Sequence, residues 1–396
     1  MKANPGGIVS PADVVGRERL IAQLWATLER QSLVLVSERR LGKTTIARKM
    51  QAEAAPDLRV IYMDIGAVSR AAELVERLAQ AIRVHLGATK KATGWLAEHW
   101  SALGGLEVGG ILRLPESKGP SWKVALERLL GDLLHGTGQR TILIWDELPW
   151  ALQKIARTEG EPVVVDLLDL LRSLRQTHPG LRLVYAGSIG LHHVVTGLRD
   201  EGYVNSPLEG MCIVEVPPLD RSDAAGLAAA LLRGEGLAAA NATTAACIAD
   251  LVDAIPFYIH QVVAALADQR RTATPETVAA TIAAALTAPE DPWDLHHFRS
   301  RLNEYYQNEA STVRALLDIL AETQPLDLND LHARLQTAFR PDNDRARTLL
   351  GADRAPLRSL VRLMQRDHYL DLVPGGAYRF RFDLIRRWWR CDLGLD

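Results

Sequence analysis

The sequence predicts an α/β protein built on a parallel, doubly wound sheet, followed by a helical domain and a small domain of helices and a hairpin. One observation predicts the sheet. Apolar runs with strand character alternate with amphipathic helical patterns through the first 216 residues, and this alternation is typical of βαβ units. A second observation separates the sheet from the helical domain, because strand patterns stop after Pro217-Pro218 and alanine-rich helical sequence follows.

Five apolar runs are candidate strands of this sheet. Each is short and almost continuously apolar, as expected for a strand buried on both faces. The runs are Leu33–Val36, Leu58–Met63, Thr141–Trp145, Leu181–Ala186 and Cys212–Val216. The helical patterns between them include Glu18–Arg30, Ala71–Leu86 and Lys123–Leu134. The glycine-containing segment 94–119 fits this alternation worst, so we expect a long loop or a short hairpin there.

The first strand leads into the most informative motif of the chain. Leu33–Val36 is followed by a polar loop, and Gly42-Lys43-Thr44 opens an amphipathic helix. Strand, loop and helix in this order bind phosphate groups, because backbone N–H groups, a lysine and an Mg²⁺-binding hydroxyl meet there. Ser37 stands where the pattern G-x-x-x-x-G-K-[ST] has its first glycine. The motif predicts a site for ATP and Mg²⁺, with Ser37, Arg40, Leu41, Gly42, Lys43, Thr44 and Thr45 as candidate residues.

The third predicted strand ends in two acids, Asp146 and Glu147. Ligands of open α/β sheets lie at the carboxyl ends of the strands, so we expect Asp146 to act with Thr44 as an Mg²⁺ ligand, directly or through water. Glu147 would then polarise the water that attacks the γ-phosphate. The alternative is that these acids only cap a helix that begins near Leu148. Their pairing with the phosphate loop favours the nucleotide site.

The fourth predicted strand ends at Gly187-Ser188. If this strand lies between the first and the third, Ser188 would face the γ-phosphate and act as a catalytic sensor. The alternative is that the segment is only a turn. The pairs His192-His193 and His296-His297 are poor metal sites, because neighbours in a helix do not share a face and no further ligands stand at the required spacing.

The composition shift predicts three domains: a sheet-containing core over residues 1–216, a helical domain over 217–288 and a winged helix over 289–396. The first helix of the middle domain would be capped by Asp220 or Ser222. Around a turn at Pro374-Gly375-Gly376, we expect a hairpin. The elements of the last domain are the helices Trp293–Tyr306, Ser311–Thr323, Leu328–Leu335, Pro356–Arg366 and Leu384–Asp392 and the strands Tyr369–Val373 and Tyr378–Phe382.

Four arginines recur at every fourth position on, or just before, the predicted helix Pro356–Arg366 of the winged helix. They are Arg354, Arg358, Arg362 and Arg366. On a DNA-reading helix they would contact phosphates, but a solvated face or a surface that docks on protein gives the same pattern. Because four residues overshoot a helical turn by about 40°, at most two or three could reach one groove wall. We therefore rank docking slightly above DNA.

The composition limits the remaining possibilities. The chain is 47% hydrophobic and 24% charged, as is common for soluble globular proteins. Its net charge of −2 requires any nucleic-acid binding to come from a local patch. The three widely spaced cysteines favour a reducing, cytoplasmic location. No apolar stretch has the length of a membrane span and the N-terminus lacks a signal-peptide core, so we expect no membrane association.

Taken together, these motifs resemble a known family. Residues 37–45 are similar to the arginine-bearing phosphate loop, G-x-R-R-x-G-K-T, of the archaeal-type ATPases, which are related to AAA ATPases and to the STAND class of P-loop NTPases. Residues 143–150 and 186–190 resemble the acidic and post-strand segments of that family. Residues 15–18 resemble its G-R-x box and residues 254–258 its G-x-P box. The resemblance implies that Gly16, Arg17 and Pro256 contribute to the nucleotide site, with Pro256 packed on the adenine.

Three positions depart from the family pattern. Ser37 and Ala254 each replace a glycine, and Arg381-Phe382-Asp383 stands where related switch proteins carry Met-His-Asp. The histidine of that motif reads the β-phosphate, so we do not expect a phosphate sensor of this kind in the winged helix.

The resemblance implies an ATP-hydrolysing switch whose nucleotide state controls a partner protein or an assembly of identical chains. Such sites are often completed by an arginine from a neighbouring subunit, and Arg172, Arg175 and Arg199 are the candidates. A second reading is a DNA-remodelling ATPase similar to origin-recognition ATPases, with the winged helix on duplex DNA. A third is a nucleotide-binding scaffold with negligible turnover.

Overall fold

The computed structural model describes residues 1–86, 106–108, 111–113, 122–135, 139–187, 190–200, 202–237, 241–341 and 343–395. The chain forms two compact units. The core unit comprises Ser10–Ser37 and Gly42–Val216, and the helical unit comprises Met1–Val9, Glu38–Leu41 and Pro217–Asp396. Within the described ranges, no helix is both long and apolar enough to cross a membrane.

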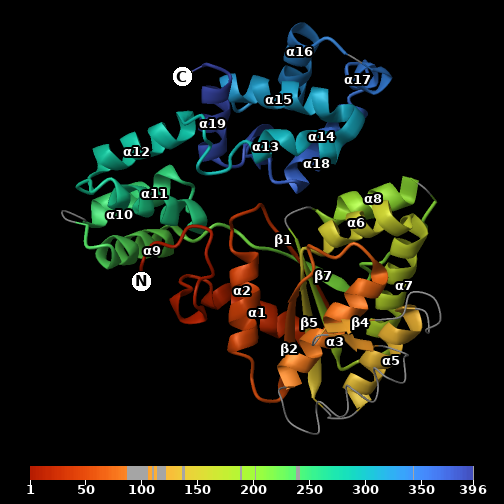
Figure 1. Cartoon of the computed structure of the whole chain (residues 1–396). Coiled ribbons are helices and arrows are strands. Elements are labelled where there is room, and N and C mark those ends of the chain that lie inside the picture. The colour runs from red at the N-terminus through yellow and green to blue at the C-terminus, as the bar shows by residue number, and fades with distance from the viewer. Residues whose placement is uncertain are drawn as a thin grey trace. The chain divides into compact units, whose positions relative to one another are not determined.

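The core unit is built on a five-stranded sheet in which every pair of neighbours is parallel (Figure 1). Its order is β2-β5-β6-β1-β7. The strands are β1 (Ser32–Val36), β2 (Leu58–Asp64), β5 (Arg140–Asp146), β6 (Leu181–Ala186) and β7 (Met211–Glu215). All five predicted strands are confirmed. The apolar runs of the first four are largely buried, whereas β7, at the edge of the sheet, is partly exposed. Strand β6 lies between β1 and β5. This is the strand order that the predicted role of Ser188 requires.

Helices cover both faces of this sheet. Figure 1 shows α1 and α2 on one side and α3, α5 and α7 on the other. Side chains of α3, α5, α6 and α7 join those of the strands in one buried hydrophobic cluster, which includes Trp145 and Tyr185. The helices of the unit are α1 (Glu18–Leu28), α2 (Lys43–Ala52), α3 (Ala71–Leu86), α5 (Trp122–His135), α6 (Leu148–Glu159), α7 (Glu161–Thr177) and α8 (Leu191–Asp200), preceded by a 3₁₀ turn, η1 (Pro11–Asp13).

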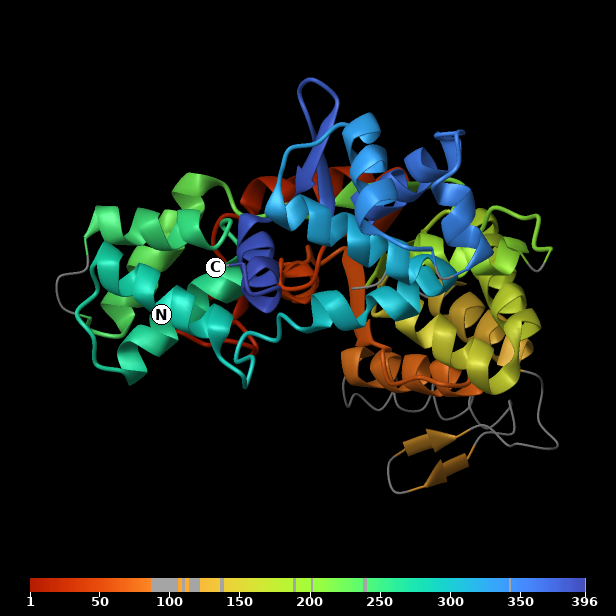
Figure 2. The same ribbon diagram turned by 90° about the horizontal axis from the view of Figure 1, so that it is seen from above.

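Segment 94–119, which fits the βα alternation worst, contains a hairpin. Strands β3 (Leu106–Val108) and β4 (Ile111–Arg113) pair antiparallel in a sheet of their own. Figure 2 shows this hairpin apart from the five-stranded sheet. The short-hairpin alternative is therefore correct for these six residues, and the rest of the segment lies outside the described residues.

The helical unit begins with four helices that lie together in Figure 1. They are α9 (Arg221–Gly234), α10 (Ala242–Leu251), α11 (Pro256–Asp268) and α12 (Pro275–Thr287). Asp220 occupies the N-cap position of α9, although its side chain makes no capping hydrogen bond, and Ser222 lies inside the helix. The elements that follow are α13 (His297–Ser300), α14 (Leu302–Tyr306), η2 (Gln307–Glu309), α15 (Ala310–Glu322), α16 (Leu328–Ala338), α17 (Asp344–Leu349), α18 (Ala355–Arg366), β8 (Leu370–Val373), β9 (Ala377–Phe380) and α19 (Asp383–Asp392).

The predicted helix over residues 293–306 is wrong at its start, because helical structure begins only at His297. The carboxylate of Asp291 accepts hydrogen bonds from the backbone N–H groups of Leu295, at 2.8 Å, and His296, at 2.7 Å. Asp294 adopts a left-handed conformation, with φ of 54°. These hydrogen bonds favour a turn over a helix, because short acidic side chains commonly compete for backbone N–H groups.

The closing hairpin forms as predicted. Strands β8 and β9 pair antiparallel around a turn in which Gly375 and Gly376 have φ of 98° and 83°, values that favour glycine. An isolated bridge joins Leu326, between α15 and α16, to Tyr378 of β9. Helix α17 was not predicted from the sequence.

Candidate nucleotide-binding site

The phosphate loop, residues 37–44, joins β1 to α2. We call Ser37 and Gly42–Thr44, which belong to the core unit, its inner residues. Glu38–Leu41 cluster with the helical unit and are called its outer residues. The two sets have different surroundings and are described in turn.

Among the inner residues, Lys43 and Ser37 form a buried pair. The Lys43 side chain is only 7% exposed, and its Nζ donates to the carbonyl oxygen of Ser37 at 2.9 Å and to Ser37 Oγ at 2.8 Å. A buried ammonium group needs such acceptors. Phosphate oxygens can replace them with stronger, charge-assisted bonds. Ser37 does not have a positive φ, so serine is tolerated at this position without backbone strain.

Gly42 ends the loop at the N-cap of α2 with φ of 93°. A Cβ atom added there would meet only Thr45 Cβ, at 3.9 Å, so the requirement for glycine is conformational rather than steric. Thr45 follows in the first turn of α2 and is half-buried. This geometry leaves the first backbone N–H groups of α2 able to bind an anion.

Asp146 is the last residue of β5 and is 2% exposed. Thr44 Oγ1 donates to its Oδ2 at 2.5 Å, and Tyr62 OH donates to the same oxygen at 3.2 Å. Its Oδ1 accepts from the backbone N–H of Glu147 at 3.1 Å. The structure thus brings together Thr44 and Asp146, 102 residues apart. Hydroxyl and carboxylate oxygens are the donors that Mg²⁺ prefers, so this pair fits the ion.

Glu147 occupies the N-cap position of α6, but its side chain makes no capping hydrogen bond. Its φ of 60° is left-handed, an unusual conformation for glutamate that is common at functional sites. Gly66 lies against it, because a Cβ atom at Gly66 would be 3.1 Å from Glu147 Cβ. The alternative that Glu147 only caps the helix therefore does not account for its side chain. Ser188, at the end of the neighbouring strand, lies outside the described residues.

The residues assigned by resemblance lie in both units. Gly16 has φ of 70°, and Arg17 is 4% exposed at the N-cap of α1. In the helical unit, Pro256 begins α11. Ala254, two residues earlier, has φ of 54°, a conformation in which a glycine would be unstrained.

The outer residue Glu38 forms a buried ion pair within the helical unit. Its carboxylate is 2% exposed and accepts two hydrogen bonds of 2.6 Å from the guanidinium of Arg301, which is 8% exposed. Arg301 Nε donates to Tyr369 OH at 2.6 Å, and that hydroxyl donates to the carbonyl oxygen of Phe298 at 2.7 Å. Burial disfavours the charge of Glu38, but Arg301 holds the pKa of this carboxyl below its usual range. Sequence reasoning missed this pair.

Arg40 and Leu41 are the other candidate residues of the outer set. Arg40 has partners in the helical unit, and Leu41 is buried. Arg40 has φ of 72°, pairs with Asp294 at 2.9 Å and stacks on the ring of Phe257, 3.9 Å from its centroid. Leu41 is 1% exposed. The loop is thus held on its outer side by several contacts rather than by Glu38 alone.

Comparison with known proteins identifies the fold of this chain. No protein-family model matches the sequence, and no curated protein is similar to it in sequence. The Walker-type ATPase PABY2304 of Pyrococcus abyssi has a similar structure, with a TM-score of 0.65 and 17% identity over 96% of this chain and 97% of that one. The chain has the fold of a Walker-type P-loop ATPase.

Two further structures are similar at lower TM-scores. The ORC2 protein of Aeropyrum pernix has a TM-score of 0.49 and 12% identity, covering 95% of this chain and 92% of that one. The RuvB Holliday junction branch migration motor of Thermotoga maritima has a TM-score of 0.39 and 14% identity, covering 92% and 91%.

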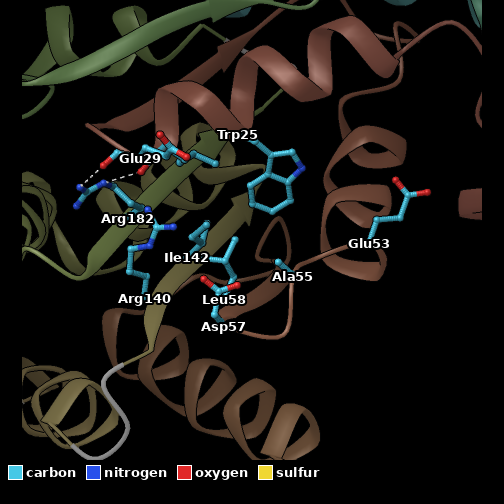
Figure 3. Close-up of a pocket in the computed structure, with 10 residues that line it drawn as sticks. Trp25, Glu29, Glu53, Ala55, Asp57, Leu58, Arg140, Ile142 and Arg182 are labelled. Atoms are coloured by element: carbon cyan, nitrogen blue, oxygen red, sulfur yellow. Dashed lines mark hydrogen bonds between the residues drawn. The ribbon is translucent and has the colours of Figure 1, made fainter.

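A P-loop ATPase binds its nucleotide at the carboxyl ends of the strands, but the core unit also has a cavity of about 360 Å³ at the opposite edge (Figure 3). Its lining residues Leu58 and Arg140 are the first residues of β2 and β5. Arg182 beside them donates to the carbonyl oxygens of Leu28, at 2.8 Å, and Glu29, at 3.0 Å. These bonds give Arg182 a structural role, and the cavity is separate from the phosphate loop.

Two of the three arginines considered for a neighbouring subunit's site have partners in their own core unit. Arg172 pairs with Glu209, and Arg175 donates to the carbonyl oxygens of Pro207, at 2.6 Å, and Glu209, at 3.2 Å. Arg199, near the end of α8, is exposed. Of the three, Arg199 is thus the one that is exposed.

Proposed function

We propose that this chain is an ATP-binding and ATP-hydrolysing switch whose nucleotide state controls a partner protein or an assembly of identical chains. The P-loop ATPase fold and the convergence of Lys43, Thr44, Asp146 and Glu147 support ATP as the ligand. The contact between Glu38 and Arg301 supports the switch, and it is the observation that carries the proposal.

The inner residues and the acids would perform the chemistry. Lys43 would exchange the oxygens of Ser37 for phosphate oxygens, and the backbone at Gly42 would donate to the same groups. Thr44 and Asp146 would hold Mg²⁺, which supplies positive charge to the phosphates when it is bound. Glu147 would orient the attacking water, and Ser188 would contact the γ-phosphate.

The outer residues would report on that chemistry. If the loop shifts its backbone when Lys43 exchanges the oxygens of Ser37 for phosphate oxygens, Glu38 must respond, because it lies one residue from Ser37. Because the carboxylate of Glu38 is buried and bonded twice to Arg301, the loop cannot move without moving or breaking this pair. A nucleotide that binds the two arrangements with different affinity would therefore shift the helical unit between them.

We propose that residues 217–288 are the helical lid, with Pro256 on the adenine, and that residues 289–396 form a winged helix. The order α15, bridge at Leu326, α16, α18 and hairpin β8–β9 supports the winged helix. An assembly of copies would place Arg199 of one chain at the site of the next.

ATP turnover and nucleotide affinity test this proposal together. The full chain should hydrolyse ATP, and Lys43→Ala should lose nucleotide affinity in calorimetry, because it removes the cation that follows the phosphates. Particle mass measured with ATP, with ADP and without nucleotide tests the assembly. A chain that binds neither nucleotide, or a Lys43→Ala variant that binds as tightly as the parent, would show the proposal to be wrong.

A second candidate function is DNA binding through α18. Arg358, Arg362 and Arg366 are exposed on this helix, and none of them forms an ion pair with any residue that the structure describes. Arg354 does not belong to the same stripe, because its guanidinium bonds to His332 at 2.8 Å and to the carbonyl oxygen of Gly351 at 3.0 Å. Three unpaired cations on one exposed helix suit phosphate contacts.

Fluorescence anisotropy on a labelled duplex separates this candidate from docking on protein. If the three arginines contact phosphates, each alanine substitution should lower the slope of log affinity against log salt by about one unit. Arg221→Ala is the matched control, because it removes an exposed arginine that is already paired with Asp250. Absence of binding at low salt would exclude the DNA function.

A further inference from the structure

Tyr62 lies on β2 beside the proposed magnesium site, and no motif of the sequence drew attention to it. Side chains alternate along a strand, so Tyr62 faces away from the hydrophobic cluster that contains its neighbour Met63. Its hydroxyl donates to Asp146 Oδ2 at 3.2 Å. On α2, Arg48 lies over the tyrosine ring, with its guanidinium carbon 5.1 Å from the centroid. The Tyr62 side chain is thus fixed between α2 and β5.

The hydrogen bonds of Asp146 show what this position can do. Its Oδ2 accepts from the hydroxyls of Thr44 and Tyr62, and its Oδ1 accepts from the backbone N–H of Glu147. Of these three donors, Thr44 is itself expected to bind Mg²⁺, and the N–H of Glu147 holds only the far oxygen. Tyr62 is therefore the side-chain donor that can orient Oδ2 without being a ligand.

The direction of this hydrogen bond follows from the groups involved. The Tyr62 hydroxyl carries a proton that it can donate, whereas an oxygen of an ionised carboxylate only accepts.

We propose that Tyr62 is a positioning residue of the magnesium site, which acts by holding the carboxylate of Asp146 toward Thr44. The inference rests on the proposed function, because it concerns the Mg²⁺ that accompanies ATP. Groups that hydrogen-bond to a metal ligand commonly control metal affinity by about 10- to 100-fold. Tyr62 should therefore affect only that part of nucleotide affinity which depends on Mg²⁺.

Calorimetric titration of the full chain with ADP, in excess Mg²⁺ and in EDTA, tests this. Tyr62→Phe keeps the ring and removes the hydroxyl. We expect its affinity for ADP in EDTA to equal that of the parent, and the gain in affinity on adding Mg²⁺ to fall by about 10-fold.

Tyr203→Phe is the matched control. Tyr203 OH also donates to a carboxylate of the core unit, that of Asp169, at 2.8 Å, but away from the phosphate loop. Thermal unfolding of both variants reports any general loss of stability, and Tyr203→Phe should keep the full Mg²⁺ effect.

The outcomes separate this inference from the proposed function. If Tyr62→Phe shows the same gain from Mg²⁺ as the parent, or loses affinity equally in Mg²⁺ and in EDTA, Tyr62 does not position the magnesium site. If the parent itself binds no ADP under either condition, the proposed function fails instead.

Discussion

The inner and outer residues of the phosphate loop are held in opposite ways. Lys43 of the inner set bonds to two uncharged oxygens of Ser37, its neighbour in the same unit. Glu38 of the outer set forms a two-bond ion pair with Arg301, 263 residues away in the sequence and buried in the helical unit. The first arrangement is suited to exchange with a ligand, and the second resists change.

This difference assigns separate tasks to adjacent residues. Replacing neutral acceptors by phosphate gains charge-assisted bonds, so the inner residues can release Ser37 at little cost. Breaking a buried ion pair leaves an uncompensated charge, so the outer residues should follow the helical unit rather than leave it. Under the proposed function, a ligand at the inner residues would therefore act on the helical unit through the backbone that the two sets share.

The largest expected effect comes from breaking the outer contact. Arg301→Met leaves the carboxylate of Glu38 buried without its partner and should lower the free energy of unfolding by about 3–5 kcal/mol. Urea unfolding followed by far-ultraviolet circular dichroism measures it.

The double variant Glu38→Met/Arg301→Met is its control. Replacing both charges by apolar groups of similar size is often neutral or stabilising, so most of the lost stability should return. A double variant as unstable as Arg301→Met would show that the uncompensated charge is not the cause.

The inner side is tested next, through its chemistry. Glu147→Gln keeps the shape of the side chain and removes the charge that orients water. Turnover of ATP should fall by roughly 100-fold or more, equivalent to about 2.7 kcal/mol of activation free energy, while ATP affinity stays unchanged. Glu209→Gln, which changes a glutamate of the same unit paired with Arg172, should leave turnover unaffected. Equal turnover in Glu147→Gln would assign the general base to another residue.

The inner residues could be predicted from the sequence and the outer contact could not, for a physical reason. Gly42, Lys43 and Thr44 are close in sequence, and Asp146 follows an apolar run whose place at the end of a parallel strand is predictable. The four largely buried strands could be predicted equally well, because burial on both faces leaves a continuous apolar run.

Other features depend on contacts that local patterns do not encode. Arg301 meets Glu38 only after two distant segments have folded together, and an arginine in an amphipathic segment looks like a solvated one. Tyr62 was missed because a tyrosine in a buried strand has the same pattern as any core aromatic residue. The start of the helix predicted at Trp293 was wrong because the side chain of Asp291 competes for backbone N–H groups.

A smaller effect concerns Asp253, a half-buried carboxylate of the helical unit, in comparison with the buried Glu38. Burial raises the pKa of Asp253 to about 6, against the opposing hydrogen bond from the backbone N–H of Leu384. Its stabilisation is complete below the ordinary value near 3.8 and is lost as pH rises through about 6. Glu38 has the opposite sign: its lowered pKa gives stability above the ordinary value of 4.5, which is lost as pH falls.

Asp253→Asn should remove the pH dependence of stability that comes from Asp253 and keep the one that comes from Glu38. Between about pH 4 and pH 7, the unfolding free energy of the variant should rise relative to the parent by roughly 1–3 kcal/mol, since one pKa unit corresponds to about 1.4 kcal/mol and solvent screens a half-buried group. Urea unfolding at several pH values measures the difference. Asp250→Asn, which changes an acid paired with Arg221 at the surface of the same unit, is the control for the loss of a carboxylate.

Hydrogen exchange with and without ATP tests most directly whether the outer residues transmit nucleotide state. The Glu147→Gln variant is suited to it, because it should bind ATP without consuming it. We predict that ATP changes the exchange of backbone amides in residues 297–306 and 366–370, around Arg301 and Tyr369, and that the same variant carrying Lys43→Ala shows no change. Saturating ATP that alters exchange only within residues 10–37 and 42–216 would contradict the account.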